Sequence, residues 1–276
     1  MPDYLNAYAQ ATGHQAPLQA SLLDPLFAAM KSGTALPPRA QQAVDVGLTA
    51  HTLNDQRENP ALWAYYRWVM QHYFAGQTIN ELSARLIGLA FTSAGLFESD
   101  LPQPLSFNPW QAGAAGELPL LAKRAVVLEN NGVFILLHRL HPTWPLVLQG
   151  GNDFNATYVK LIQRLAERGV EYTYLGDLDS KGIQMAEHFA SLLPAAQEKK
   201  VLAIQNPERV IGWLTSTLAK SDTARSRRLK VTSPQFEAEM DSVVVTGKFV
   251  EQEQLLSDYE RLIPAWLANE NRREDK

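Results

Sequence analysis

The sequence contains no cysteine among its 276 residues. This absence excludes disulfide bonds, zinc sites built from thiolates and a cysteine nucleophile. The chain also lacks an uncharged apolar run of roughly 18 residues, the length that a membrane-spanning helix needs. Its start, Met-Pro-Asp-Tyr-Leu-Asn, has neither the basic region nor the apolar core of a signal peptide. We therefore expect a cytoplasmic protein that does not contact a membrane.

An excess of positive charge is absent as well. Lys and Arg total 25 against 29 Asp and Glu, which gives a net charge of −4. This balance is not typical of a stand-alone DNA-binding protein, although it is compatible with local basic patches and clustered catalytic acids. No Gly-x-x-x-x-Gly-Lys-Ser/Thr loop occurs, so nucleotide hydrolysis would need a partner protein. With 46% hydrophobic and 20% charged residues, the chain is typical of a globular protein with one or two domains.

The first 115 residues predict a small α-helical domain, with a possible cap or helix-turn-helix role. Asn59-Pro60 precedes a helix whose apolar side chains recur at helical spacing as far as Phe74. Thr78 then begins a capping-box pattern, and a second helix is expected to run toward Gly95. Such a pair forms either a helical hairpin or a helix-turn-helix.

A stretch rich in proline and glycine over residues 98–120 predicts a domain boundary near residue 115, with a possible short edge strand from Leu105. Beyond it, apolar β-type runs alternate with helical patterns, which predicts an α/β domain over 116–268 with a mostly parallel, Rossmann-like sheet and a flexible tail over 269–276. The expected strands span 125–128, 146–149, 172–175 and 200–204, and the expected helices span about 133–140, 155–168 and 183–193.

Three carboxylates end two of these strand-like runs. Glu129 closes one run, and Asp177 and Asp179 close another. In an open α/β sheet, ligands bind outside the carboxyl ends of the strands, and hard oxygen ligands hold Mg²⁺. An alternative is that the acids are solvated residues near turns. Like carboxylates ~4 Å apart repel by ~4 kcal/mol at an effective dielectric of about 20, so a cluster calls for a cation.

Two glycines favour the site over the solvated alternative. Gly176 and Gly182 bracket the Asp-x-Asp motif and permit close backbone approach and a sharp turn into the next helix. The two aspartates are two residues apart, so in an extended chain their side chains lie on the same side.

The order and spacing of four segments resemble the Toprim domain of topoisomerases, bacterial primases and related nucleases. Within that group they are most similar to topoisomerase VI A subunits and to JetD-like nuclease subunits of Wadjet plasmid-defence systems. The resemblance covers roughly residues 118–267. The segments are Val127-Leu-Glu-Asn-Asn-Gly-Val-Phe, Leu146-Val-Leu-Gln-Gly-Gly-Asn, Tyr174-Leu-Gly-Asp-Leu-Asp-Ser-Lys-Gly-Ile-Gln-Met-Ala and Val250-Glu-Gln-Glu-Gln-Leu-Leu.

The resemblance implies a role for each matching residue. Glu129 corresponds to a general acid/base or metal ligand, and Asp177 and Asp179 correspond to a metal-binding pair. The late Glu-x-Glu of the family falls at Glu251 and Glu253, whose alternative is a solvated helix start. The residues expected to contact phosphate or DNA are Gly150, Gly151, Asn152 and Lys181.

The chain departs from the resembling proteins in its N-terminal part. JetD-like proteins commonly carry a longer region with a winged-helix cap, and topoisomerase VI A subunits use a cap-domain tyrosine as nucleophile. Here Tyr65, Tyr66 and Tyr73 lie on an apolar helical pattern and are expected in the core. We therefore assign no tyrosine nucleophile.

A basic run from Lys220 to Lys230 is a second candidate for phosphate contact. It includes Arg225, Arg227 and Arg228, and it is either a DNA-contacting segment or a solvated loop.

Together these observations favour a Mg²⁺- or Mn²⁺-dependent endonuclease that hydrolyses DNA phosphodiesters. The resemblance implies double-stranded plasmid DNA as substrate and an SMC-type motor complex as partner. A homodimer is expected because cutting both strands needs two sites. The alternatives are a non-catalytic Toprim-fold subunit for assembly or DNA binding, and another metal-dependent phosphotransfer enzyme.

Overall fold

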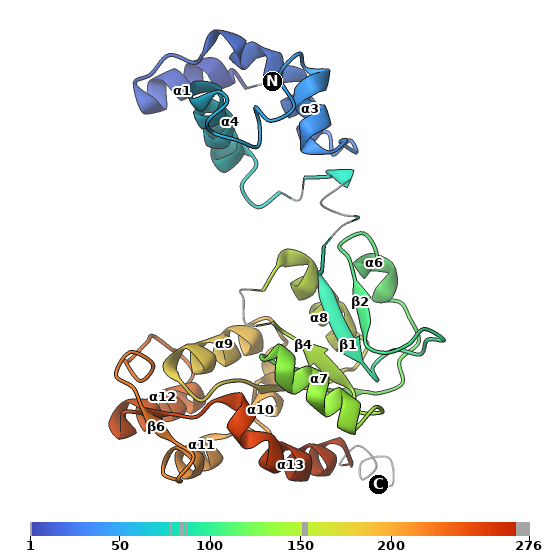
Figure 1. The fold of residues 1–276 in the computed structure, drawn as a ribbon, viewed down its shortest axis with the longest axis vertical. Helices are drawn as coiled ribbons and strands as arrows, with labels where there is room; N and C mark the ends of the chain where they lie inside the picture. Colours follow the sequence, from blue (N-terminus) through green and yellow to red (C-terminus); the bar gives the residue numbers. More distant parts are fainter. Residues whose placement is uncertain (1, 78, 83–85, 87, 151–153, 269–276) are drawn as a thin grey trace. The chain divides into compact units, whose positions relative to one another are not determined.

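The computed structural model describes residues 2–77, 79–82, 86, 88–150 and 154–268. The chain divides into two compact units, Met1–Gly88 and Leu89–Lys276 (Figure 1). Among the described residues, none of the helices combines the length and the apolar character required to cross a bilayer. The predicted tail over 269–276 lies outside the described residues.

The first unit is helical, as predicted. The longest of its described helices, α4, begins at Pro60, and the side chain of Asn59 accepts a hydrogen bond from the backbone N–H of Leu62 at 3.1 Å. Tyr65 and Tyr66 are buried, and the ring of Tyr73 meets that of Tyr4 edge-on. Their packing in the core is therefore confirmed. The elements are α1 Tyr4–Thr12, η1 Leu18–Leu23, α2 Asp24–Lys31, α3 Arg39–Asp45 and α4 Pro60–Tyr73.

The predicted helix toward Gly95 is wrong in its second half. Thr78 lies outside the described residues, whereas Leu82 and Leu86 are helical. Phe91–Ala94 forms strand β1, which is buried along its whole length because strands pair with it on both sides. These pairings also correct the predicted boundary near residue 115. Residues 89–115 belong to the second unit because β1 and β2 join its sheet.

The sheet of the second unit is mixed, and its five described strands follow the order β2-β1-β4-β3-β5. Strands β3, β4 and β5 are parallel, and β1 and β2 are antiparallel to their neighbours. The short strand predicted from Leu105 is confirmed as β2 at one edge. The strands are β1 Phe91–Ala94, β2 Leu105–Phe107, β3 Arg124–Leu128, β4 Leu146–Leu148 and β5 Glu171–Leu175.

The strand predicted over 200–204 is a short helix instead. Helix α10 spans Glu198–Val201 and packs beside β5, with Val201 buried. Glu198 in its first turn and Lys200 in its last turn complement the helix dipole, which favours a helical turn. The backbone carbonyl of Val201 accepts a hydrogen bond from the Thr173 hydroxyl at 3.1 Å, so the apolar run covers the strand without joining the sheet.

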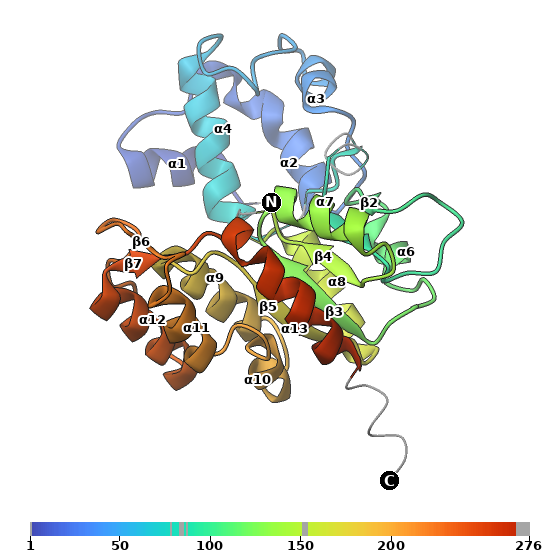
Figure 2. The ribbon, with the colours of Figure 1, turned by 60° about the horizontal axis from the view of Figure 1, so that its bottom comes forward.

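The remaining helices pack on this sheet or on one another: α11 contacts α12, and α12 contacts α9. Helices α7 and α13 contact β3 and lie in front of the strands in Figure 2, while α9 contacts β5. A small second sheet pairs β6 with β7. The elements are α6 Ala112–Ala115, α7 Asn131–Leu140, α8 Ala156–Glu167, α9 Ser180–Ser191, η2 Ala195–Gln197, α11 Pro207–Leu214, β6 Lys220–Ser221, α12 Pro234–Thr246, β7 Lys248–Phe249, η3 Gln252–Leu255 and α13 Leu256–Ala268.

Candidate functional site

The parallel pairing of β3 with β5 brings the predicted carboxylates to one edge of the sheet. Leu128 is opposite Leu175 in the register, and the backbone N–H of Glu129 donates to the carbonyl of Leu175 at 3.1 Å. Glu129 and Asp177 therefore leave neighbouring strands at the same end. An antiparallel bridge between Leu178 and Val250 adds the segment before η3 to this edge.

The two glycines around the Asp-x-Asp motif are required by close contacts, as predicted. A Cβ at position 176 would lie 2.4 Å from Glu129 Oε2. A Cβ at position 182 would lie 2.1 Å from the carbonyl oxygen of Asp177. Real Cβ atoms do not approach other heavy atoms this closely. Position 182 therefore excludes a side chain because the clash is with backbone, whereas a side chain at position 176 would displace the Glu129 carboxylate.

The guanidinium of Arg225 lies among three carboxylates of the site. Its Nε donates to Asp179 Oδ2 and its Nη2 donates to Asp177 Oδ2, both at 2.7 Å. Nη1 donates to Glu251 Oε1 at 3.1 Å. The guanidinium carbon lies 3.9 Å from the centre of the Phe249 ring, a cation–π contact that holds it from the side. Arg225 therefore supplies positive charge to this part of the site.

This contact changes the expectation for Arg225. Its position in a basic run suggested contact with DNA phosphate, but in this structure its donors are directed to the acids. In the described part of the chain, His, Asp and Glu side chains form no group of three that is arranged to hold a metal ion. The mutual repulsion of Asp177 and Asp179 is offset here by an arginine of the same chain.

The pKa of Glu129 is raised to about 7. Burial of the carboxyl is the main cause, and the negative charges of Asp177 and Asp179 add to it. The Tyr174 hydroxyl lies 3.5 Å from Glu129 Oε2 and favours the charged form only weakly. Burial also raises the pKa of Asp177. Glu129 can therefore accept or release a proton near neutral pH.

Asp179 also has a structural role at the start of α9. Its side chain accepts a hydrogen bond from the backbone N–H of Gly182 at 2.8 Å and so caps the helix. Only 7% of Asp179 is exposed. The cap fixes one carboxylate oxygen and leaves the other directed to Arg225.

Two buried glutamines position the strand ends, and the sequence interpretation missed both. The backbone N–H of Gln252 donates a hydrogen bond to Asp177 Oδ1. The side-chain amide of Gln252 donates through its nitrogen to the carbonyl of Leu175, and its oxygen accepts from the backbone N–H of Asn130. Gln205 exchanges two hydrogen bonds with the backbone of Gly176. In the sequence, Gln205 directly follows the apolar run of residues 201–204, and Gln252 lies between the two glutamates of the Glu-x-Glu pattern. These positions were the only indication of their roles.

Glu251 and Glu253 both lie at the site and at a helix start. Glu251 caps η3 in a capping box with Gln254 and contacts Arg225. Glu253 Oε1 accepts a hydrogen bond from the side chain of Asn130 at 2.6 Å. The two glutamates therefore lie at the start of η3 and also contact residues at the edge of the sheet that carries Glu129 and Asp177.

The structure describes four of the other residues predicted to contact phosphate: Gly150, Lys181, Arg227 and Arg228. Arg227 and Lys181 are exposed, and Arg228 forms an ion pair with Asp241 on α12. Gly150 has a positive φ of 82° and follows β4 at the same sheet edge as Glu129. Gly151 and Asn152 lie outside the described residues.

Comparison with known proteins gives one family. The family, described as "Protein of unknown function C-terminus (DUF2399)", matches residues 111–259, which is more than half of the chain. No curated protein matches the chain. The matched range contains β3, β5 and η3, the elements that carry the site.

Proposed function

The chain belongs to the DUF2399 family, and we propose that it is a metal-dependent DNA endonuclease with a Toprim-type, Rossmann-like α/β domain. One observation carries the proposal: neighbouring parallel strands deliver Glu129 and the Asp177–Asp179 pair to one sheet edge. The two glycines without room for a Cβ support close approach of these acids.

The chemistry of the donors fits Mg²⁺ or Mn²⁺. Glu129, Asp177 and Asp179 would hold the ion, because carboxylate oxygens are hard ligands that these cations prefer. Gly176 supports this fit, since the absence of a side chain at this position lets the Glu129 carboxylate lie against the backbone that leads to Asp177. The bound ion would neutralise charge that develops on the phosphate and lower the pKa of water.

The side chains of the protein have two further tasks in this proposal. Glu129, whose pKa is raised to about 7, would accept a proton from the attacking water at a carboxylate oxygen. Arg225, once it no longer contacts Asp177 and Asp179, would direct its fork of N–H donors to a DNA phosphate. Gln252 and Gln205 would keep the strand ends in place while Arg225 moves and Glu129 accepts the proton.

A nicking assay on supercoiled plasmid tests the proposal. We expect nicked or linear product with Mg²⁺ or Mn²⁺ and none with a chelator. Glu129→Gln should lower the rate by at least about 100-fold, the lower range for loss of a general acid/base. Asp177→Ala should abolish cleavage, because it removes a ligand of the ion. Asp100→Asn, at an exposed position, is the matched control and should cut normally. Intact plasmid under every metal condition would contradict the nuclease proposal.

The contact of Arg225 with the acids favours a second candidate, a non-catalytic subunit for assembly or DNA binding. In that case the ion pairs of Arg225 with Asp177 and Asp179 would be a permanent part of the fold. DNA binding without cleavage, unchanged by divalent metal, would support it. A third candidate is another metal-dependent phosphotransfer enzyme, which would release phosphate from small phosphate esters and leave plasmid intact.

The proposed partners come from the resemblance to JetD-like proteins. They are double-stranded plasmid DNA, an SMC-type motor complex in the cytoplasm and a second copy of this chain. Linear product that forms together with nicked product would support a dimer with two sites. Co-purification with an SMC-type ATPase would test the remaining partner.

A further inference from the structure

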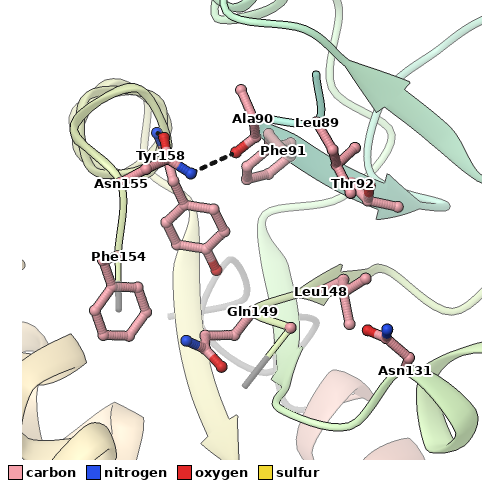
Figure 3. Close-up of a pocket in the computed structure, with 11 residues that line it drawn as sticks. Leu89, Ala90, Phe91, Thr92, Asn131, Leu148, Gln149, Phe154, Asn155 and Tyr158 are labelled. Atoms are coloured by element: carbon pink, nitrogen blue, oxygen red, sulfur yellow. Dashed lines mark hydrogen bonds between the residues drawn. The ribbon is translucent and has the colours of Figure 1, made fainter. Parts of the chain in front are cut away.

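A buried carboxyl beside the candidate site has no task in the proposed chemistry. Glu239, on α12, is only 2% exposed. Its Oε1 has no hydrogen-bond partner within the part of the chain that the structure describes. The hydroxyl of Tyr158 shares this property, but its ring packs against Phe91 and Phe154 (Figure 3). Glu239 instead borders the turn that carries Asp177.

A small cavity lies between Glu239 and this turn. Its volume is about 10 Å³, and Gly176, Asp177, Gly182 and Gln205 line it together with Glu239. A cavity of roughly 10–15 Å³ holds one water molecule, provided that the water meets about two to four polar groups. Glu239 Oε1 does not reach the turn directly, since it has no partner among the described residues. The space therefore fits a single water molecule between the carboxyl and the turn.

Three polar groups around the cavity can bind such a water. Within the described residues, the main-chain carbonyl of Asp177 accepts no hydrogen bond, and its oxygen lies against Gly182. The carbonyl of Gly176 accepts from Gln205 Nε2 at 3.1 Å, which leaves its second lone pair. Burial raises the pKa of Glu239 well above its ordinary value. The Glu239 carboxyl therefore keeps its proton and both donates and accepts.

The bridge would complete the support of the residue that carries the metal ligand. Gln205 already binds the backbone of Gly176, and the backbone N–H of Gln252 donates to Asp177 Oδ1. The main-chain carbonyl of Asp177 is the group that these contacts leave without a partner in the described part of the chain. Groups that orient a metal ligand from behind tune the affinity of the site. A water held by Glu239 would supply this missing contact.

On the premise of the proposed metal-dependent function, we propose that Glu239 is a positioning residue for Asp177. One buried water joins the Glu239 carboxyl to the main-chain carbonyl of Asp177 and fixes the turn between β5 and α9. Glu239 contacts neither the ion nor the DNA, and it acts through this water on Asp177. The role needs a neutral side chain that donates and accepts, so Gln can replace Glu239 and Leu cannot.

Calorimetric titration of the full chain with Mg²⁺ tests the role. We expect Glu239→Leu to bind Mg²⁺ at least about tenfold more weakly than the wild type, the lower range for loss of a group that supports a metal ligand. Glu239→Gln should bind as the wild type does. Glu237→Leu, at an exposed position of α12, is the matched control. The Tm of Glu239→Leu should stay near that of the wild type, because Leu replaces a carboxyl without a protein partner.

Amide hydrogen exchange in chelator tests the same bridge without metal. The N–H groups of Gly176 and Gly182 donate to the side chains of Gln205 and Asp179. We expect both groups to exchange faster in Glu239→Leu and at the wild-type rate in Glu239→Gln, because exchange follows local opening of the turn. A wild type that does not bind Mg²⁺ would contradict the metal-dependent function, and the exchange rates would still decide the role of Glu239.

Three outcomes would overturn the inference. If the wild type binds Mg²⁺, an unchanged affinity in Glu239→Leu would show that Asp177 does not depend on Glu239. Unchanged exchange of Gly176 and Gly182 in this variant would show the same, whether or not the ion binds. Equal losses in Glu239→Gln and Glu239→Leu would exclude a bridge made by a neutral hydrogen-bonding group.

Discussion

At the scale of single residues, the most informative contact is that of Arg225 with the acids. Its guanidinium replaces the cation that repulsion between Asp177 and Asp179 requires. From the sequence, the basic run that contains Arg225 was either a DNA-contacting segment or a solvated loop. The carboxylates lie 46 and 48 residues away, so only the tertiary fold reveals the pairing.

Loss of this cation should destabilise the protein in the absence of metal. We expect Arg225→Met, which keeps a long apolar side chain but removes the guanidinium, to lower the free energy of unfolding in chelator by about 1–3 kcal/mol. This loss is smaller than for a fully buried pair. Addition of Mg²⁺ should recover much of this loss, so the variant should show a larger metal-dependent rise in Tm than the wild type. Thermal melts with chelator and with Mg²⁺ measure both effects.

Arg228→Met is the matched control, because Arg228 and its partner Asp241 are each about half exposed. Such a surface pair contributes less than about 1 kcal/mol. Equal metal-dependent shifts in wild type and in Arg225→Met would show that the ion binds away from Asp177 and Asp179.

The raised pKa of Glu129 predicts a pH-dependent stability. The folded protein holds the Glu129 proton up to a pKa of about 7, whereas the unfolded chain releases it near the ordinary value of 4.5. Between these values only the folded state is protonated, so the free energy of unfolding falls as pH rises through this window. In chelator, Glu129→Gln should remove this part of the dependence and be more stable than the wild type at pH 8. Urea unfolding from pH 4.5 to 8 measures the difference, and parallel curves for the two proteins would contradict it.

At the scale of elements, the apolar runs that end in acids were predictable. Their length, their β-type residues and the following glycine identify β3 and β5, and parallel pairing then follows from the intervening helices. The run 200–204 is similarly apolar but folds as α10 and the turn after it, because a short apolar run does not distinguish a strand from a buried helical turn. The contacts of Gln205 and Gln252 could not be predicted from these runs, since each binds a strand end that is distant in sequence.

The turn between β5 and α9 should not tolerate a methyl group. Gly182→Ala would place a Cβ against the carbonyl of Asp177, and we expect a loss of about 1–3 kcal/mol in the free energy of unfolding. Gly212, in α11, has open space around its Cα, so Gly212→Ala is the control and should stabilise by about 0.4–1 kcal/mol. Denaturant unfolding of both variants measures the contrast. A neutral Gly182→Ala would mean that the turn opens without loss.

At the scale of the whole molecule, the division between units depends on strand pairing rather than on composition. The proline- and glycine-rich stretch predicted the end of a domain, but β1 and β2 on either side of residue 100 extend the sheet through β4. A composition rich in proline and glycine indicates irregular backbone. It does not show which of the two hydrophobic cores the segment packs against.

Truncation at the two boundaries should give different results. A fragment of residues 89–276 should unfold cooperatively, because it keeps the buried strand β1. A fragment of residues 116–276 loses β1, exposes the edge of β4 and should have a clearly lower Tm. Circular dichroism melts of the two fragments measure this difference, and equal Tm values would favour the boundary near residue 115.

The position of Arg225 has a consequence for how metal and DNA would act on each other. A divalent ion at Asp177 and Asp179 competes with the guanidinium, and a phosphate competes with the acids for the same guanidinium. Each ligand thereby frees the binding group of the other. Thermodynamic linkage then requires that DNA raise the affinity for metal by the same factor by which metal raises the affinity for DNA. Under the proposed function, the two ligands bind as a cooperative pair, and in the free protein the guanidinium offsets part of the charge of the acids.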